Sequence, residues 1–296
     1  MAKSNTKGTN FLVQGSILAI ASIISRIIGL IYRIPMTAII GDVGNNYYAA
    51  AFDIYNVMLI ISSYSLPLAV SKLVSAKMAK GQFKTAYQVL KGALLFALVS
   101  GTIVAVIVFF GAGFFTKTLL STPNSIFALR VLAPALVIVA VLGVIRGFFQ
   151  GLGTMMPSAV SQIIEQVVNA IVSVWAAYVL YRVGAKTGAV LGDKEHYAAA
   201  YGAAGGTLGT NLGSVAALLF VLFVFAVYLR VFKRIMKKDR HVKVDSFAYT
   251  MKVLVITIIP VLLSTTIYNI SGIIDQGIFK KVALMQGYAN DDVEVW

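Results

Sequence analysis

The chain has 296 residues, of which 59% are hydrophobic and only 12% charged, and its mean hydropathy is +0.86. Soluble domains have about 25% charged residues, so this composition predicts an integral membrane protein. The net charge of +14 does not indicate a nucleic-acid partner, because the basic residues gather in connections between apolar segments. The chain has no cysteine, and its two histidines lie in separate polar connections, so we expect no disulfide, no metal and no cofactor.

Seven apolar runs are long enough to cross a membrane, which takes about 20 residues in a helix. Helices are expected because a backbone exposed to lipid must satisfy its own hydrogen bonds. The first run lacks a small-residue cleavage site, so we expect a retained span and not a signal peptide. The sequence therefore predicts an all-α integral membrane protein with spans at residues 11–32, 47–70, 86–114, 126–149, 158–181, 200–229 and 249–275.

The basic residues predict the orientation of these spans. Sixteen of the 25 lysines and arginines fall on alternate connections or next to them, whereas the opposite connections carry fewer and include acids such as Asp42, Asp193 and Glu195. The positive-inside rule then places the N-terminus in the cytoplasm, and we expect a bacterial cytoplasmic membrane. We interpret the basic connection 230–243 as a topological determinant, with contact to anionic membrane lipids as the alternative. The sixteen are Lys3, Lys7, Lys72, Lys77, Lys80, Lys84, Lys91, Arg146, Arg230, Lys233, Arg234, Lys237, Lys238, Arg240, Lys243 and Lys252.

A polar face is predicted in the fifth span, where Gln162, Glu165, Asn169 and Ser173 follow at helical spacing. A carboxylate inside an apolar span is costly, so this face should turn toward other helices or a water-filled cavity. Glu165 then either takes part in function or hydrogen-bonds neighbouring amides. In the sixth span, Gly205 and Gly209 form a GxxxG pair, which we interpret as a site of close helix packing.

Arg26 is the main candidate for contact with a substrate, because it lies in the middle of the first span. Arg33 falls on the same helix face, and two guanidinium groups can hold a diphosphate or carboxylates. The alternatives are that Arg26 pairs internally with Asp53 or Glu165, or that either arginine extends to the membrane interface.

Two further carboxylates lie within spans. Asp53 is a candidate counter-ion or ion-coupling site, and Asp275, near the outer end of the seventh span, is either interfacial or functional. The sequence carries no nucleophile elbow, P-loop or metal-binding histidine pair, so we expect a transporter and not an enzyme.

Four stretches carry a family resemblance: Ser25–Gly29, Pro67–Lys72, Arg146–Gly151 and Pro157–Gln162. Together they resemble the polysaccharide-biosynthesis flippases of the MOP superfamily, specifically the Gram-positive MurJ and stage V sporulation protein B group. The last two stretches are fairly specific to this group, whereas Ser-Arg-x-x-Gly alone is a weak signal.

The resemblance implies a two-lobed bundle of about twice this length. Residues 1–245 would form the N-terminal six-helix lobe, and residues 246–296 would begin the second lobe with the seventh helix, so we expect the chain to be an N-terminal fragment. Arg26 matches the family's cavity arginine in the first helix. A second arginine of Gram-negative relatives falls on Tyr32, one position before Arg33, and an acidic residue of the seventh helix matches Asp275.

The function implied is the flipping of a lipid-linked oligosaccharide pyrophosphate, lipid II above all, to the outer leaflet by alternating access. Glu165 and Asp53 would orient Arg26 or sense ions. The alternatives are a flippase for another lipid-linked polysaccharide, a cation-coupled drug exporter of the same superfamily, and a membrane scaffold that recruits cell-wall synthesis enzymes.

Overall fold

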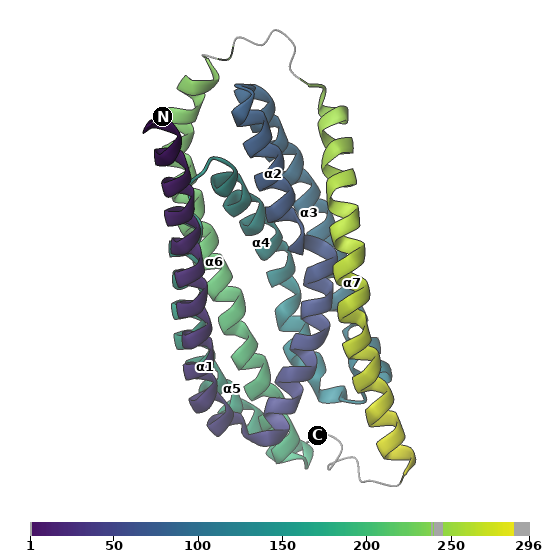
Figure 1. The fold of residues 1–296 in the computed structure, drawn as a ribbon. Helices are drawn as coiled ribbons and strands as arrows, with labels where there is room; N and C mark the ends of the chain where they lie inside the picture. The colour runs from purple at the N-terminus through teal and green to yellow at the C-terminus, as the bar shows by residue number, and fades with distance from the viewer. Residues whose placement is uncertain (1, 238, 240–244, 287–296) are drawn as a thin grey trace.

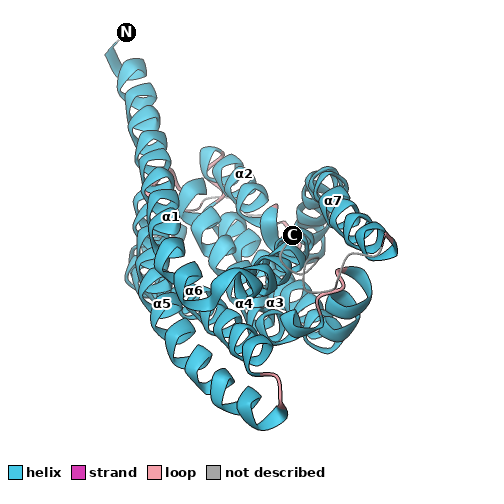
Figure 2. Ribbon diagram, turned by 90° about the horizontal axis from the view of Figure 1, so that it is seen from below, coloured by secondary structure: helices cyan, strands magenta, loops and turns pink. Residues whose placement is uncertain are grey.

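The computed structural model describes residues 2–237, 239 and 245–286, and within these residues it is built from helices without a strand (Figures 1 and 2). The predicted all-α fold is confirmed. The long helices are α1 (Ala2–Leu59), α2 (Leu66–Ala79), α3 (Phe83–Gly113), α4 (Ile126–Gly151), α5 (Met156–Leu191), α6 (Lys194–Met236) and α7 (Phe247–Met285).

The first helical segment reverses direction at Gly41. It runs over Val13–Ala79, 67 residues, which as a straight helix would measure about 100 Å, three times the hydrocarbon core. Gly41 has φ 69° and ψ −179°, a conformation open to glycine, and Figure 1 shows the chain running down α1 and returning toward α2. The first pass therefore continues to Gly41 and does not end at residue 32 as predicted, because the backbone stays helical through Pro35 to Ile40.

Five helical segments of the described chain are long and apolar enough to cross a membrane. They are Val13–Ala79, Phe83–Leu119, Pro123–Gly151, Met156–Leu191 and Lys194–Met236. The first makes two passes because of its reversal. The predicted seventh span falls on α7, which contains the shorter apolar helical stretch Phe247–Pro260.

The predicted basic connections gather at one end of the bundle. Figure 1 places the start of α1, the α2–α3 turn, the α4–α5 turn, the end of α6 and the start of α7 at this end. The α2–α3 turn closes at Gly81, whose φ of 72° favours glycine, as expected for a helix stop. Of the predicted basic residues, Lys238, Arg240 and Lys243 lie outside the described residues.

The predicted packing role of the glycines in α6 is confirmed. A Cβ added to Gly205 would collide with the backbone of Ala176, and one added to Gly209 would collide with Ser173 and Asn169. These missing side chains let α6 approach α5 closely, as small residues do in membrane helix pairs.

A second glycine row joins α4 to α2. A Cβ on Gly147 would lie 2.8 Å from Pro67 Cα, and one on Gly151 would lie 2.9 Å from the Ser71 carbonyl oxygen. Gly143 lies one turn before Gly147 and faces the Pro67 ring. The stretch beginning at Pro67 and the stretch beginning at Arg146, about 80 residues apart in sequence, are therefore in direct contact.

Candidate functional site

Two cavities lie one after the other along α1 and share Arg26. The polar cavity has a volume of about 320 Å³ and is lined by Ser22, Ser25, Arg26, Arg146, Gln162, Glu165 and Gln166. The aromatic cavity has a volume of about 500 Å³ and is lined by Arg26, Gly29, Leu30, Tyr32, Arg33, Tyr48, Ala49, Phe52, Asp53 and Asn56. Both volumes lie in the range of small-molecule sites.

An ion pair joins α4 to α5 at the polar cavity. Arg146 Nη2 donates to Glu165 Oε2 at 2.8 Å, and Arg146 Nε donates to Ser161 Oγ at 2.8 Å. The two charged side chains are mostly buried, with 13% and 20% of their surface exposed. On the α1 side, Ser22 Oγ contacts Gln162 Oε1 at 3.3 Å. The predicted polar face of α5 therefore meets both α4 and α1.

Contacts with α2, α6 and α5 hold the backbone around Arg146 in place, and the Arg146 side chain points toward α5. Gly147 packs on Pro67 of α2, and the Phe148 ring packs on Phe232 of α6 with 5.5 Å between centroids. The Arg146 carbonyl accepts a hydrogen bond from Ser158 Oγ at 3.3 Å. Three of the four stretches that carried the family resemblance thus meet at this point.

In the aromatic cavity, the Arg33 guanidinium lies over the Tyr48 ring, 5.8 Å from its centroid. This contact orients the cation without neutralising it. Asp53 supplies a carboxylate to the same cavity. Arg26, Arg33 and Asp53 therefore line one cavity.

Behind the aromatic cavity, a hydrogen-bond chain links α1 to α5 and α6. Asn169 Nδ2 donates to the Tyr32 hydroxyl at 3.2 Å, and Asn169 Oδ1 accepts from Ser173 Oγ at 2.9 Å. Ser173 Oγ also lies 2.7 Å from the Gly206 carbonyl oxygen. Asn169 is 6% exposed and lines neither cavity, so in this structure it connects helices.

Arg26 is exposed at the junction of the two cavities. Within the described part of the chain it makes no hydrogen bond or ion pair, and the alternative of a pair with Glu165 is not found because Glu165 binds Arg146. Together the cavities hold three arginines and two carboxylates, so they favour an anionic group.

The structure separates the predicted site residues into three groups. Arg26, Arg33 and Asp53 line the aromatic cavity, and Arg26, Gln162 and Glu165 line the polar cavity. Asn169, which is buried, and Asp275, which is exposed on α7, line neither. Sequence reasoning missed Arg146, which was assigned to topology alone. A usable signal was present, since Arg146 lies within the apolar run of α4 and not beyond it.

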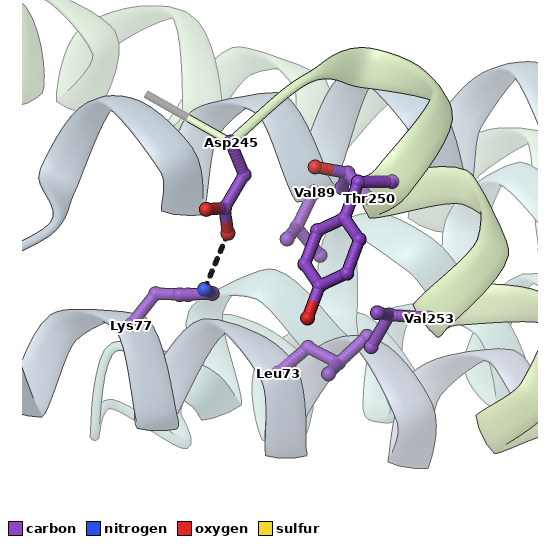
Figure 3. A pocket seen from close by; sticks show the side chains of 7 residues that line it. Leu73, Lys77, Val89, Asp245, Thr250 and Val253 are labelled. Atoms are coloured by element: carbon purple, nitrogen blue, oxygen red, sulfur yellow. Dashed lines mark hydrogen bonds and ion pairs between the residues drawn. The ribbon is translucent and has the colours of Figure 1, made fainter. Parts of the chain in front are cut away.

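A smaller pocket of about 60 Å³ lies where α7 begins, between α2 and α3. Figure 3 shows Lys77 of α2 paired with Asp245, at 2.6 Å between Nζ and Oδ2, beside Leu73, Val89 and Val253. On the other side of the α6–α7 connection, Asp239 Oδ2 accepts a hydrogen bond from the Lys84 amide at 2.9 Å. Both ends of this connection are thus attached to the α2–α3 hairpin.

A bundle of membrane-spanning helices with charged cavities along α1 defines a multi-pass membrane transporter. Residues 12–202 match the model of the family described as polysaccharide biosynthesis protein, and the chain belongs to that family.

Curated relatives and a solved structure agree with this assignment. The chain is 31% identical over 181 residues to the lipid II flippase MurJ of Bacillus subtilis, covering 58% of this chain and 33% of the relative. It is 29% identical over 153 residues to stage V sporulation protein B of the same organism, covering 52% and 30%. The chain thus spans about a third of the length of these relatives.

Among solved structures, a MOP superfamily transporter from Pyrococcus furiosus superposes with a TM-score of 0.64 at 17% identity. The match covers 91% of this chain and 55% of that one. At this identity the likeness concerns the fold, which is that of a MOP-type transporter.

Proposed function

We propose that this chain provides the first lobe of a flippase that moves a lipid-linked saccharide diphosphate, of the lipid II kind, across a bacterial cytoplasmic membrane. Membership in the polysaccharide biosynthesis family and the similarity to a lipid II flippase support the substrate class. The proposal assigns residues 1–245 to the first lobe and residues 246–296 to the start of the second. It places the N-terminus in the cytoplasm, which the gathering of basic connections at one end of the bundle supports.

The observation that carries the proposal is the position of Arg26. Its guanidinium group is shared by both cavities, is exposed, and is not neutralised by the nearby Glu165, which is bound to Arg146. A guanidinium group offers several N–H donors in a plane and binds phosphate oxygens in pairs. Arg33, on the same face two turns along α1, adds a second cation.

In this mechanism the diphosphate binds near Arg26 and Arg33 while the saccharide remains hydrated in the cavities. The polyprenyl tail stays in the lipid, because removing it from hydrocarbon would cost about 0.8 kcal/mol per CH₂ group. Rocking of the two lobes then opens the binding region to the outer side, as in transporters built from related halves. The protein needs no catalytic residue for this movement, since no covalent bond changes.

The same geometry argues against a drug exporter for organic cations. Such a cavity needs an excess of carboxylate over cation, whereas Glu165 is already paired with Arg146 and Asp53 shares its cavity with Arg26 and Arg33. A scaffold that recruits cell-wall synthesis enzymes would have no need for Arg26, so an Arg26 variant separates this alternative from transport.

Complementation tests the proposal. Cells depleted of their own lipid II flippase receive the full-length gene that encodes this chain, either unchanged or as Arg26→Ala, with membrane levels compared by blot. We expect rescue by the unchanged gene and none by Arg26→Ala at equal levels. Arg130→Ala is a matched control, because Arg130 is also exposed on a spanning helix but lines neither cavity. Rescue by Arg26→Ala would remove this residue from the mechanism.

A further inference from the structure

The polar cavity differs from the aromatic cavity in the chemistry of its walls. Apart from the arginines, its lining consists of hydroxyl groups, carboxamides and one carboxylate, with no aromatic or aliphatic side chain. Carboxamides donate to and accept from the hydroxyl groups of a sugar, and carboxylates accept from them. The polar cavity therefore presents a set of groups suited to an uncharged ligand rich in hydroxyls.

The charge of this cavity is also largely balanced. Arg146 and Glu165 neutralise each other, and Arg146 Nε is engaged by Ser161, so Arg26 at the boundary supplies the remaining positive charge. An anion bound at Arg26 would thus have the polar cavity, whose other charges cancel, on one side and the aromatic cavity, which contains Arg33, on the other.

Ser25 gives a second, independent indication of a ligand. Its Oγ is buried and has no hydrogen-bond partner within the described residues, although it lines this cavity. Buried hydroxyl groups are almost always hydrogen-bonded, to protein, water or ligand. The cavity volume of about 320 Å³ lies in the range of small-molecule sites and leaves room for a ligand the size of one sugar.

We propose that the polar cavity is a saccharide subsite, which binds the first sugar attached to the diphosphate held at Arg26. This inference rests on the proposed function and adds a source of substrate specificity to it. Glu165 accepts hydrogen bonds from sugar hydroxyls and is held in place by Arg146, which acts as a positioning residue. Gln162 and Gln166 bind hydroxyl or acetamido groups, and Ser25 gains its missing partner.

The test measures binding of two probes to the purified product of the full-length gene in nanodiscs, referred to below as the unchanged chain. The first probe is a short prenyl diphosphate that carries one N-acetylhexosamine. The second is the same prenyl diphosphate capped with a methyl ester, so that both probes have the same charge. The variants are Gln166→Leu and Gln162→Leu. The matched control is Gln88→Leu, because Gln88 is a half-buried glutamine of α3 that lines neither cavity.

We expect the unchanged chain to bind the sugar probe more tightly than the capped probe. Each of the two cavity variants should lose about fivefold in affinity for the sugar probe, the effect of one lost hydrogen bond, and keep its affinity for the capped probe. Gln88→Leu should bind both probes as the unchanged chain does. Arg26→Ala should weaken both probes to the same extent.

Three results would overturn the inference. Equal affinity of the unchanged chain for both probes would remove the saccharide subsite while leaving the diphosphate site of the proposed function intact. Equal weakening of both probes by Gln166→Leu would show that this residue only maintains the shape of the cavity. Failure of the unchanged chain to bind either probe would overturn the proposed function and the subsite with it.

Discussion

Arg146 and Glu165, which both line the polar cavity, form a 2.8 Å ion pair that joins α4 to α5. The same guanidinium group donates a hydrogen bond to Ser161, one turn earlier on α5. The pair thus fixes the relative position of two helices and the carboxylate that we assign to sugar binding. Removing either partner leaves the other as a mostly buried charge, which is more costly than loss of the contact itself.

Glu165→Ala is therefore expected to destabilise the protein by about 2–3 kcal/mol, because it leaves the Arg146 cation without its partner. Glu165→Gln keeps a hydrogen-bond acceptor and should lose less. Thermal unfolding in detergent, followed by circular dichroism, measures both. Glu195→Gln, at an exposed glutamate of α6, is the control and should change little. Identical melting of all three variants would contradict a structural role for the pair.

Gly147→Ala is expected to cost about 1–3 kcal/mol, because its Cβ would lie 2.8 Å from Pro67 Cα and would push α4 away from α2. The comparison is Gly15→Ala, since nothing lies within 4 Å of a Cβ at that helical position. Alanine is a better helix former than glycine, so Gly15→Ala should be neutral or slightly stabilising. Thermal unfolding in detergent measures the stability of both variants. If Gly147→Ala and Gly15→Ala lowered the stability equally, the close contact between α2 and α4 would be contradicted.

The Tyr32–Asn169 hydrogen bond should appear as coupling in a double-mutant cycle. Tyr32→Phe and Asn169→Ala each remove one side of the 3.2 Å contact, so their combined effect should be smaller than the sum of the single effects by about 0.5–1.5 kcal/mol. Additive losses in unfolding free energy would show that the two residues do not stabilise each other. Tyr249→Phe combined with Asn169→Ala gives the additive reference, since Tyr249 lies on α7 beside the smaller pocket.

The Lys77–Asp245 pair should protect the α6–α7 connection from proteolysis. Both side chains are partly exposed, at 23% and 28%, so the pair contributes on the order of 0.5–1 kcal/mol. Asp245→Asn is expected to raise the rate of tryptic cleavage in this connection about two- to fivefold at low salt. High salt should reduce the difference, because it screens exposed charges. Asp42→Asn, at an exposed aspartate near the opposite end of the bundle, should leave the rate unchanged.

The sequence predicted the helical class and the polar face of α5, because both depend on local properties. Long apolar runs require helices in a membrane, and the spacing of Gln162, Glu165 and Asn169 places them on one face whatever surrounds it. The close approach of α6 at Gly205 and Gly209 was also readable, since small residues at this spacing favour it.

The partners of the charged residues were not readable from the sequence. Both Arg26 and Arg146 had a suitable charge for Glu165, and only the placement of α4 against α2 and α6 brings Arg146 to it. Arg146 was assigned to topology because the positive-inside rule uses only the number of basic residues in each connection. The rule contains no information on contacts, so it could not predict the ion pair with Glu165. The sequence did predict two passes with a connection between residues 32 and 47, but it did not show that the helical backbone continues through most of this connection and reverses at Gly41.

The alignment of the two cavities along α1 has an electrical consequence. Arg26 and Arg33 are seven residues apart on this helix, which corresponds to about 10 Å, or roughly a third of the hydrocarbon core. A diphosphate with about two negative charges that moves outward over this distance crosses a third of the voltage. An inside-negative potential then contributes roughly 1.5 kcal/mol per 100 mV to the movement. In the proposed orientation, the membrane voltage itself would drive the anion from Arg26 to Arg33.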